Sequence, residues 1–186
     1  MEIIDKRLIF EGGSLEGKEI VSSHRVLKDL KGIFADEEAR EAMDAEQLAY
    51  EVECHFPVEE GTLGGLFFGL TKLYPGKVGN EYFMTKGHFH AESERAEYYW
   101  GIKGEGVLIL MDREGKTWGE KMYPGSLHYI PSHVAHRVAN TGEELLSFGA
   151  CWPSDAGHDY ETIATEGFSA RLLDVDGKPQ LKSSNQ

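Results

Sequence analysis

Histidine is the residue type that gives this sequence its clearest chemical signal. Six of the eight histidines lie between His88 and His158. His88 and His90 are separated by one residue, and alternate side chains of a β-strand point to the same face. Two imidazoles fixed in this way provide half of a site for Zn, Fe, Mn or Ni. The His-x-His pair alone is weak evidence, because surface and core histidines are common.

A second segment, which starts at Gly125, strengthens the metal hypothesis. It resembles the second signature of the cupin barrels, which runs glycine, five residues, proline, one residue, glycine, two residues, histidine, three residues, asparagine. Gly125, Pro131, His136 and Asn140 match this signature. Only the middle glycine departs from it, because His133 stands at that position.

The first cupin signature has His-x-His, a following glutamate, then six residues and a glycine. His88, His90, Glu97 and Gly104 supply it, although the gap between His90 and the glutamate is longer than usual. The resemblance implies that His88, His90, Glu97 and His136 converge on one divalent metal ion inside a barrel.

Glu94 is the alternative carboxylate, since it lies at the commoner spacing from His90. In cupins the glycine belongs to a Gly-x-Gly turn that ends the strand, and residues 104–106 form such a turn. Glycine is favoured there because its backbone takes positive φ without a Cβ clash. Counting back from this turn places Glu97 at the start of the strand and leaves Glu94 in the loop. We therefore predict Glu97 as the ligand.

Longer strings point to a narrower family. The chain is similar to the cupin-type phosphoglucose isomerases from about residue 24 to residue 168. This resemblance implies interconversion of glucose 6-phosphate and fructose 6-phosphate, a homodimer, and one divalent ion per subunit, Fe²⁺, Mn²⁺, Ni²⁺ or Zn²⁺. The strings that carry it are residues 74–79, 84–90, 95–99 and 155–160.

The same resemblance assigns catalytic roles. Glu97 is the carboxylate that it suggests for moving a proton between C1 and C2 through a cis-enediol, in addition to its place at the metal. A direct hydride shift is the competing mechanism, and the sequence does not separate the two. His158 and Tyr160 match positions near the sugar, where they could open the ring by proton transfer to and from O5. A histidine suits that task because its unperturbed pKa lies near working pH.

The substrate phosphate needs hydrogen-bond donors rather than bulk positive charge. Thr71, Thr85 and the backbone N–H of Gly87 match family positions that hold it. Trp152 stands where some family members carry tyrosine, so any hydrogen bond from that hydroxyl is in doubt, although the indole could still wall the pocket. The residues expected to line the substrate site are Tyr50, Thr71, Thr85, Lys86, Gly87, Tyr99 and Trp152.

Two other classes of function stay open. The first is another cupin enzyme, such as a mannose 6-phosphate isomerase or an iron dioxygenase. The second is a non-catalytic module that binds a sugar or an anion and uses the metal structurally. Fold alone does not decide between them. The polar residues expected at the barrel mouth argue against a non-catalytic module.

The elements that must position these residues are mostly strands. Short apolar runs separated by tight turns predict an all-β core, a cupin double-stranded β-helix or jelly-roll barrel, with short N- and C-terminal helical segments. Asp36 is expected to cap the second helical segment and Gly167 to end the third. The clearest predicted strands are 66–71, 98–102, 107–111, 127–130 and 145–151, and the helical segments are 26–30, 36–43 and 161–166.

The length of 186 residues fits one domain. We expect a core barrel at about 50–152, an N-terminal extension at 1–49, and a C-terminal loop, short helix and tail at 153–186. The net charge of −13 argues against nucleic acid and anionic membranes, but not against a small phosphorylated substrate. No apolar run approaches the roughly 18 residues of a spanning helix, and the N-terminus lacks a signal-peptide pattern, which predicts a cytoplasmic protein.

Overall fold

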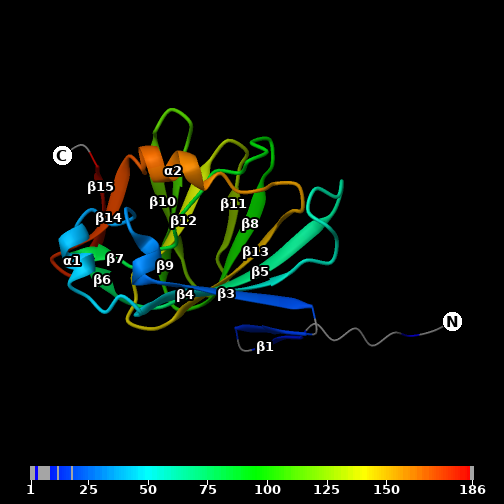
Figure 1. The fold of residues 1–186 in the computed structure, drawn as a ribbon, viewed down its shortest axis with the longest axis horizontal. Coiled ribbons are helices and arrows are strands. Elements are labelled where there is room, and N and C mark those ends of the chain that lie inside the picture. The colour runs from blue at the N-terminus through cyan, green and yellow to red at the C-terminus, as the bar shows by residue number, and fades with distance from the viewer. Residues whose placement is uncertain (1–2, 4–8, 12, 18, 185–186) are drawn as a thin grey trace.

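The computed structural model describes residues 3, 9–11, 13–17 and 19–184. Two antiparallel sheets dominate these residues (Figure 1). The larger sheet contains, in order, β11 (Leu127–Ile130), β8 (Glu97–Lys103), β13 (Leu146–Pro153), β5 (Leu66–Leu73), β4 (Leu48–His55) and β3 (Ile20–Val26). The smaller sheet contains β10 (Thr117–Met122), β9 (Gly106–Met111) and β12 (Ala135–Asn140).

Apolar side chains from both sheets form one core between them. Leu73 and Phe148 come from the larger sheet, and Leu108, Leu110 and Val138 from the smaller one, and all are almost completely buried. Packing of two antiparallel sheets around a common interior is the arrangement expected for a cupin barrel. The all-β prediction is therefore confirmed.

The apolar pattern of each strand follows its place in the barrel. β9 lies between β10 and β12, and five of its six residues are buried, so its sequence is apolar without alternation. β11 lies at a sheet edge, and His128 and Ile130 are buried while Leu127 and Tyr129 are exposed. Each of the five predicted strands corresponds to an observed strand, with ends that differ by no more than two residues.

Shorter elements close one end of the barrel. β6 (Lys77–Val78), β7 (Glu81–Tyr82), β14 (Ala170–Val175) and β15 (Lys178–Ser183) form a further small sheet beside α1 (Glu37–Glu41), as Figure 1 shows. The β14–β15 hairpin was not predicted from the sequence. β1 (Ile9–Glu11) and β2 (Ser14–Glu16) make a separate hairpin.

The helical segments form where the sequence predicts them. The first is a 3₁₀ turn, η1 (Leu27–Leu30). Asp36 accepts a hydrogen bond from the Ala39 N–H at 2.8 Å and starts α1. α2 (Tyr160–Glu166) ends at Gly167, whose φ is +72°. In the described part of the chain no helix combines the length and the apolar character needed to cross a membrane.

His133, which occupies the glycine position of the cupin signature, has a φ of +65°. The chain therefore keeps the left-handed backbone of that turn even though the glycine is absent. Histidine is among the residues that enter this region more often than most non-glycine residues.

Candidate metal centre and adjoining cavity

Three histidines and one glutamate meet inside the barrel. One potential ligand atom from each of His88, His90, Glu97 and His136 lies within 4.8 Å of the other three. The shortest approach joins Glu97 Oε1 to His136 Nε2 at 2.6 Å, and His90 Nε2 lies 3.3 Å from the same oxygen. Glu97, His90 and His136 are buried, so the cluster is largely shielded from solvent.

Both sheets and one connecting segment supply the cluster. Glu97 is the first residue of β8, in the larger sheet, and His136 lies on β12, in the smaller one. The segment that carries His88 and His90 is attached to β12 by an isolated bridge: the His88 N–H donates to His136 O at 3.2 Å, and the His136 N–H donates to His88 O at 3.0 Å.

Main-chain carbonyl oxygens orient the rings of His90 and His136. His90 Nδ1 lies 2.9 Å from Arg95 O, a contact in which Nδ1–H donates and Nε2 is left to face Glu97. Such a partner fixes the ring and its tautomer in metal sites. The buried Nε2 of His136 makes no hydrogen bond of acceptable geometry with the described residues, despite its approach to Glu97. A shared cation would satisfy both atoms, so the residues present fit a metal ion.

The pKa shifts of Glu97 and His88 also suit a cation. Burial disfavours the carboxylate form of Glu97, but the neighbouring imidazoles of His136 and His90 outweigh it and lower its pKa to about 2. Burial lowers the pKa of His88 well below its ordinary value, and the neighbouring histidines add to this effect. A carboxylate beside a neutral imidazole is the form in which these groups bind divalent ions.

Glu94, the alternative ligand, lies outside the cluster. Its side chain is 66% exposed, and its Oε1 lies 3.0 Å from Nε2 of His133. The turn at residues 104–106 explains this outcome: β8 ends at Lys103 and β9 begins at Gly106, so Glu97 rather than Glu94 starts the strand.

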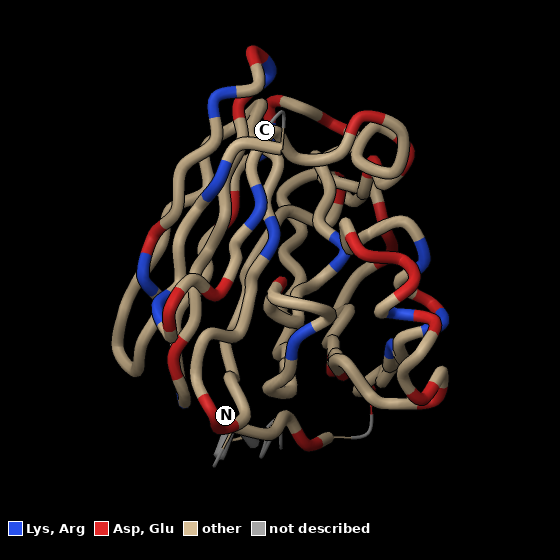
Figure 2. Tube along the Cα trace, turned by 90° about the vertical axis from the view of Figure 1, so that its left-hand side faces the viewer, with Lys and Arg blue, Asp and Glu red and all other residues tan. Residues whose placement is uncertain are grey.

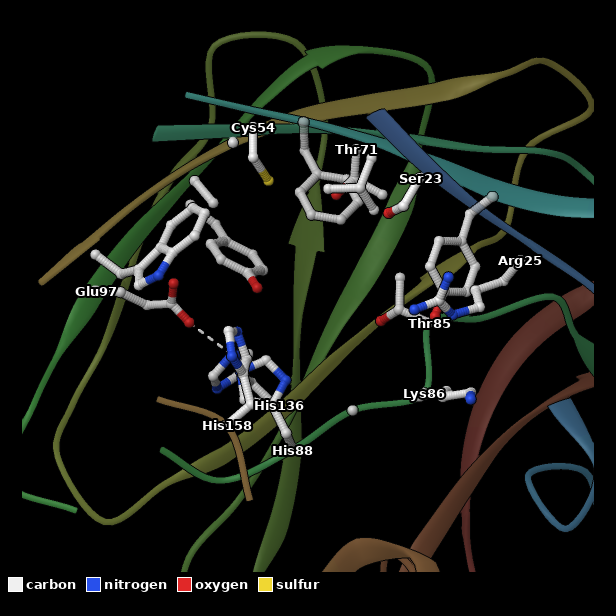
Figure 3. A pocket seen from close by; sticks show the side chains of 18 of the residues that line it. Ser23, Arg25, Cys54, Thr71, Thr85, Lys86, His88, Glu97, His136 and His158 are labelled. Atoms are coloured by element: carbon white, nitrogen blue, oxygen red, sulfur yellow. Dashed lines mark ion pairs between the residues drawn. The ribbon is translucent and has the colours of Figure 1, made fainter. Parts of the chain in front are cut away.

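A cavity of about 230 Å³ extends from the metal cluster toward β3 and β4 (Figure 3). His88, Glu97 and His136 contribute to one side of its wall. The structure brings every other residue that was predicted for the substrate site to the same cavity: Tyr50, Thr71, Thr85, Lys86, Gly87, Tyr99, Trp152, His158 and Tyr160.

Strand alternation explains the composition of this wall. Thr71 lies opposite Val52 on β4 and opposite Phe148 on β13, so these three side chains form one row across the sheet. The neighbouring row contains Arg25, which is paired with Tyr50. Sequence reasoning missed several residues that follow from this alternation or from the pairing of β3: Ser23, Arg25, Val52, Cys54, Phe56, Gly69, Phe148 and Ala150.

Two polar groups stand at the mouth, on the segment that follows β13. The rings of His158 and Tyr160 are stacked with their centroids 5.4 Å apart, and the His158 ring lies 4.5 Å from that of His88. Partial burial lowers the pKa of His158, so the neutral ring is favoured. Main-chain hydrogen bonds in both directions between Phe89 and Asp159, 3.2 and 2.8 Å long, hold this segment to the one that carries the metal cluster.

Hydroxyl groups and main chain line the opposite end of the cavity. Thr85 Oγ1 accepts a hydrogen bond from the Val138 N–H at 3.1 Å, which leaves its own O–H able to donate. Gly87 has a φ of +77°, and a Cβ there would approach Phe168 to 2.9 Å, so this position requires glycine. Burial raises the pKa of Tyr50 to about 12, so its hydroxyl stays protonated.

The two-sheet barrel and the cluster of three histidines and one glutamate inside it are typical of the cupin class of metal-binding proteins. Within that class, the family model of glucose-6-phosphate isomerase matches residues 24–186. Glucose-6-phosphate isomerase of Thermococcus litoralis is 45% identical over 181 residues, which cover 96% of this chain and 93% of the relative. The enzyme of Pyrococcus horikoshii is 46% identical over 184 residues, with 97% and 94% covered. The chain therefore belongs to the glucose-6-phosphate isomerase family.

Among solved structures, oxalate decarboxylase from Bacillus subtilis is similar to part of the chain. The TM-score is 0.46 with 19% sequence identity, and the match covers 59% of this chain and 26% of that one.

Proposed function

We propose that the protein interconverts glucose 6-phosphate and fructose 6-phosphate in the cavity beside the His88, His90, Glu97 and His136 cluster. The observation that carries this proposal is the arrangement of the cavity, which has the metal cluster on one side and hydroxyl and main-chain donors on the other. A phosphosugar has its carbonyl and its phosphate at opposite ends. The cavity therefore offers suitable chemistry to both ends of one substrate.

The cluster is suited to Fe²⁺, Mn²⁺, Ni²⁺ or Zn²⁺, because a His₃Glu donor set accepts most first-row divalent ions. Such an ion, when bound, would polarise the substrate carbonyl and stabilise the negative charge that develops on its oxygen. Elemental analysis of protein purified without added metal identifies the native ion.

Glu97 is the residue to which we assign the proton transfer. Its Oε1 faces His136 and His90, and Figure 3 shows its second oxygen pointing away from the histidines. In glucose 6-phosphate, this carboxylate would remove the proton from C2 and return it to C1, with a cis-enediol between the two steps. A hydride shift would instead keep the hydrogen on the substrate throughout. Incorporation of solvent deuterium into the product distinguishes the two.

The remaining residues would bind and open the sugar. His158 and Tyr160 stand where they could exchange a proton with the ring oxygen, and the lowered pKa of His158 leaves the neutral ring free to accept one. Thr71, Thr85 and the Gly87 N–H would hold the phosphate. The other proposed lining residues, which shape and desolvate the pocket, are Tyr50, Lys86, Tyr99 and Trp152.

The test is a coupled assay with fructose 6-phosphate, using protein loaded in turn with each of the four ions. Turnover that is lost on chelation and restored by metal supports the proposal. Comparable turnover of mannose 6-phosphate would broaden the activity, and activity that requires oxygen would indicate a dioxygenase. Binding of the sugar phosphate without turnover, with every ion, would leave a non-catalytic binding module.

Homodimeric assembly and a cytoplasmic location are parts of the proposal that rest on the family resemblance and on the sequence. Light scattering of the purified chain tests the first, and fractionation of the source cells tests the second. The single-domain division stays a prediction as well, which limited proteolysis addresses.

A further inference from the structure

Arg25 is a charged residue of the cavity whose chemistry the proposed function does not use. It lies on β3, directly opposite Tyr50 of β4, so the two side chains share one face of the sheet. Figure 3 shows Arg25 and Thr85 on the same side of the cavity, across from Glu97 and the histidines. Its position therefore matches the end of the cavity that would receive the phosphate.

Most donors of the Arg25 guanidinium are available. Among the described residues, its side chain makes a single hydrogen bond, from Nη1 to His24 O at 2.7 Å. A guanidinium carries five N–H donors, arranged in a planar fork that fits a phosphate. Its charge also reaches the cavity wall: burial raises the pKa values of Tyr50 and Tyr160, and the charge of Arg25 lowers both.

A second cavity, of about 290 Å³, adjoins the first and gives this end a positive character. Arg25, Tyr50, Lys86, Gly87 and Tyr160 line both cavities, so they form the junction between them. Lys31 adds a third cation to the outer cavity, whose lining contains one acidic residue, Asp29.

The charge of Asp29 is partly engaged, because its Oδ2 accepts a hydrogen bond from the Val26 N–H at 3.1 Å. The cationic junction stands out because the whole chain carries a net charge of −13 and acidic residues are spread over the fold (Figure 2). A local excess of cations in such a protein favours an anionic ligand.

We propose that Arg25 binds the substrate phosphate at this junction, where its guanidinium supplies the charge and Thr85 and the Gly87 N–H supply further hydrogen bonds. This inference rests on the proposed function, since it takes a phosphosugar as the ligand. Lys86 is the weaker candidate for the same role, because Figure 3 shows its side chain extending away from the other labelled side chains. Lys31 lies on the outer side of the junction and is exposed.

The experiment compares Arg25→Gln, Arg25→Lys and Lys86→Gln with Lys121→Gln, which removes an exposed cation that lines neither cavity. KM and kcat for fructose 6-phosphate are measured with the metal-loaded enzyme. Binding of inorganic phosphate is measured separately by calorimetry on metal-free protein, and circular dichroism verifies the fold of each variant.

Arg25→Gln is expected to raise KM roughly 10- to 100-fold, the range that follows from loss of a hydrogen bond to a charged group. We expect kcat to change much less, phosphate binding to weaken in parallel, and Arg25→Lys to recover part of the loss.

A KM for Arg25→Gln equal to that of Lys121→Gln, with phosphate binding unchanged, would overturn the inference while wild-type turnover still supported the proposed function. If Arg25→Gln does not fold, Arg25→Lys replaces it in the comparison. An unchanged KM for Arg25→Lys would mean that the guanidinium group does not bind the phosphate, and this too would overturn the inference. Absence of wild-type turnover would instead refute the proposed function, and the calorimetry would still report whether Arg25 binds phosphate.

Discussion

The side chains of Arg95 and Asp155 face each other through two hydrogen bonds, from Nε to Oδ1 at 2.9 Å and from Nη2 to Oδ2 at 2.7 Å. This ion pair joins two parts of the site. Arg95 also uses its carbonyl oxygen to orient His90, and Asp155 lies in the loop that carries His158. This bidentate contact therefore connects the metal cluster to the residues at the mouth, in addition to the main-chain hydrogen bonds between Phe89 and Asp159.

Asp155→Asn should therefore impair catalysis without removing any group that touches the substrate. We expect kcat/KM to fall by up to roughly 10-fold, the lower end of the effect of losing a partner of a metal ligand, because Asp155 bonds the Arg95 side chain and no ligand directly. Metal affinity, measured by competition with a chelator, should change less than activity, because the contact from Arg95 O to His90 belongs to the main chain. An unchanged kcat/KM would show that the loop holds its position without the pair.

The same pair predicts a pH dependence of stability. The hydrogen bonds from Arg95 lower the pKa of Asp155 below its ordinary value of 3.8. The contribution of the carboxylate to stability is therefore fully present above about pH 4 and is lost as the pH falls through the lower, folded-state pKa. The difference in unfolding midpoint between wild type and Asp155→Asn should be larger at pH 7 than at pH 3. A difference in unfolding midpoint that did not vary with pH would contradict this prediction.

Glu97→Gln and Glu94→Gln form a matched pair of variants. Both replace a carboxylate with an amide of the same shape, but Glu97 is buried at the cluster and Glu94 is exposed beside His133. We expect Glu97→Gln to lower kcat roughly 100- to 10,000-fold, as loss of an acid–base catalyst does, and to weaken metal binding. Glu94→Gln should stay close to wild type in the coupled assay and in metal titration. Equal losses in the two variants would overturn the assignment of Glu97.

Removal of the metal should lower stability as well as activity. Glu97 and His136 are buried and 2.6 Å apart, and without a cation the His136 Nε2 atom lacks a hydrogen bond among the described residues. With free metal at about 1,000 times its dissociation constant, binding adds roughly 4 kcal/mol to the free energy of unfolding. Calorimetric scans with and without a chelator should show a correspondingly lower midpoint in the metal-free protein. Coincident midpoints would argue against a metal in this cluster.

The metal cluster was predictable because its residues match the two cupin signatures. His88 and His90 lie outside the named strands, on a segment that a bridge joins to β12, and the turn at residues 104–106 sets the start of β8 and so favours Glu97 over Glu94. Strand alternation could have predicted that Phe148 and Ala150 line the cavity, because they lie four and two residues before Trp152 on the same strand and so face the same side. The sequence carries that information once a single residue of a strand is placed.

Other features depended on pairings between distant segments. Arg25 reaches the cavity because β3 pairs with β4, and the largely exposed β3 lacks the apolar alternation that marks a strand. The β14–β15 hairpin did have a local signal. Asp176 and Gly177 at its turn have φ of +53° and +75°, and Asp-Gly favours two-residue hairpin turns.

His133 offers a test of what replaced the cupin glycine. Its φ of +65° disfavours any side chain, and its main-chain N–H, which no substitution except proline removes, donates to Ser93 O at 2.8 Å. His133→Ala and His133→Gly both lose the side-chain contact with Glu94, so their difference reports the backbone alone. We expect the alanine variant to be less stable by about 1 kcal/mol, because a Cβ is strained in this region. Chemical denaturation of the metal-loaded protein measures this difference.

Ser132, the neighbour with ordinary φ, serves as the control, and there the alanine variant should be at least as stable as the glycine variant. Equal stability of the two His133 variants would mean that the turn relaxes to negative φ once the imidazole is removed.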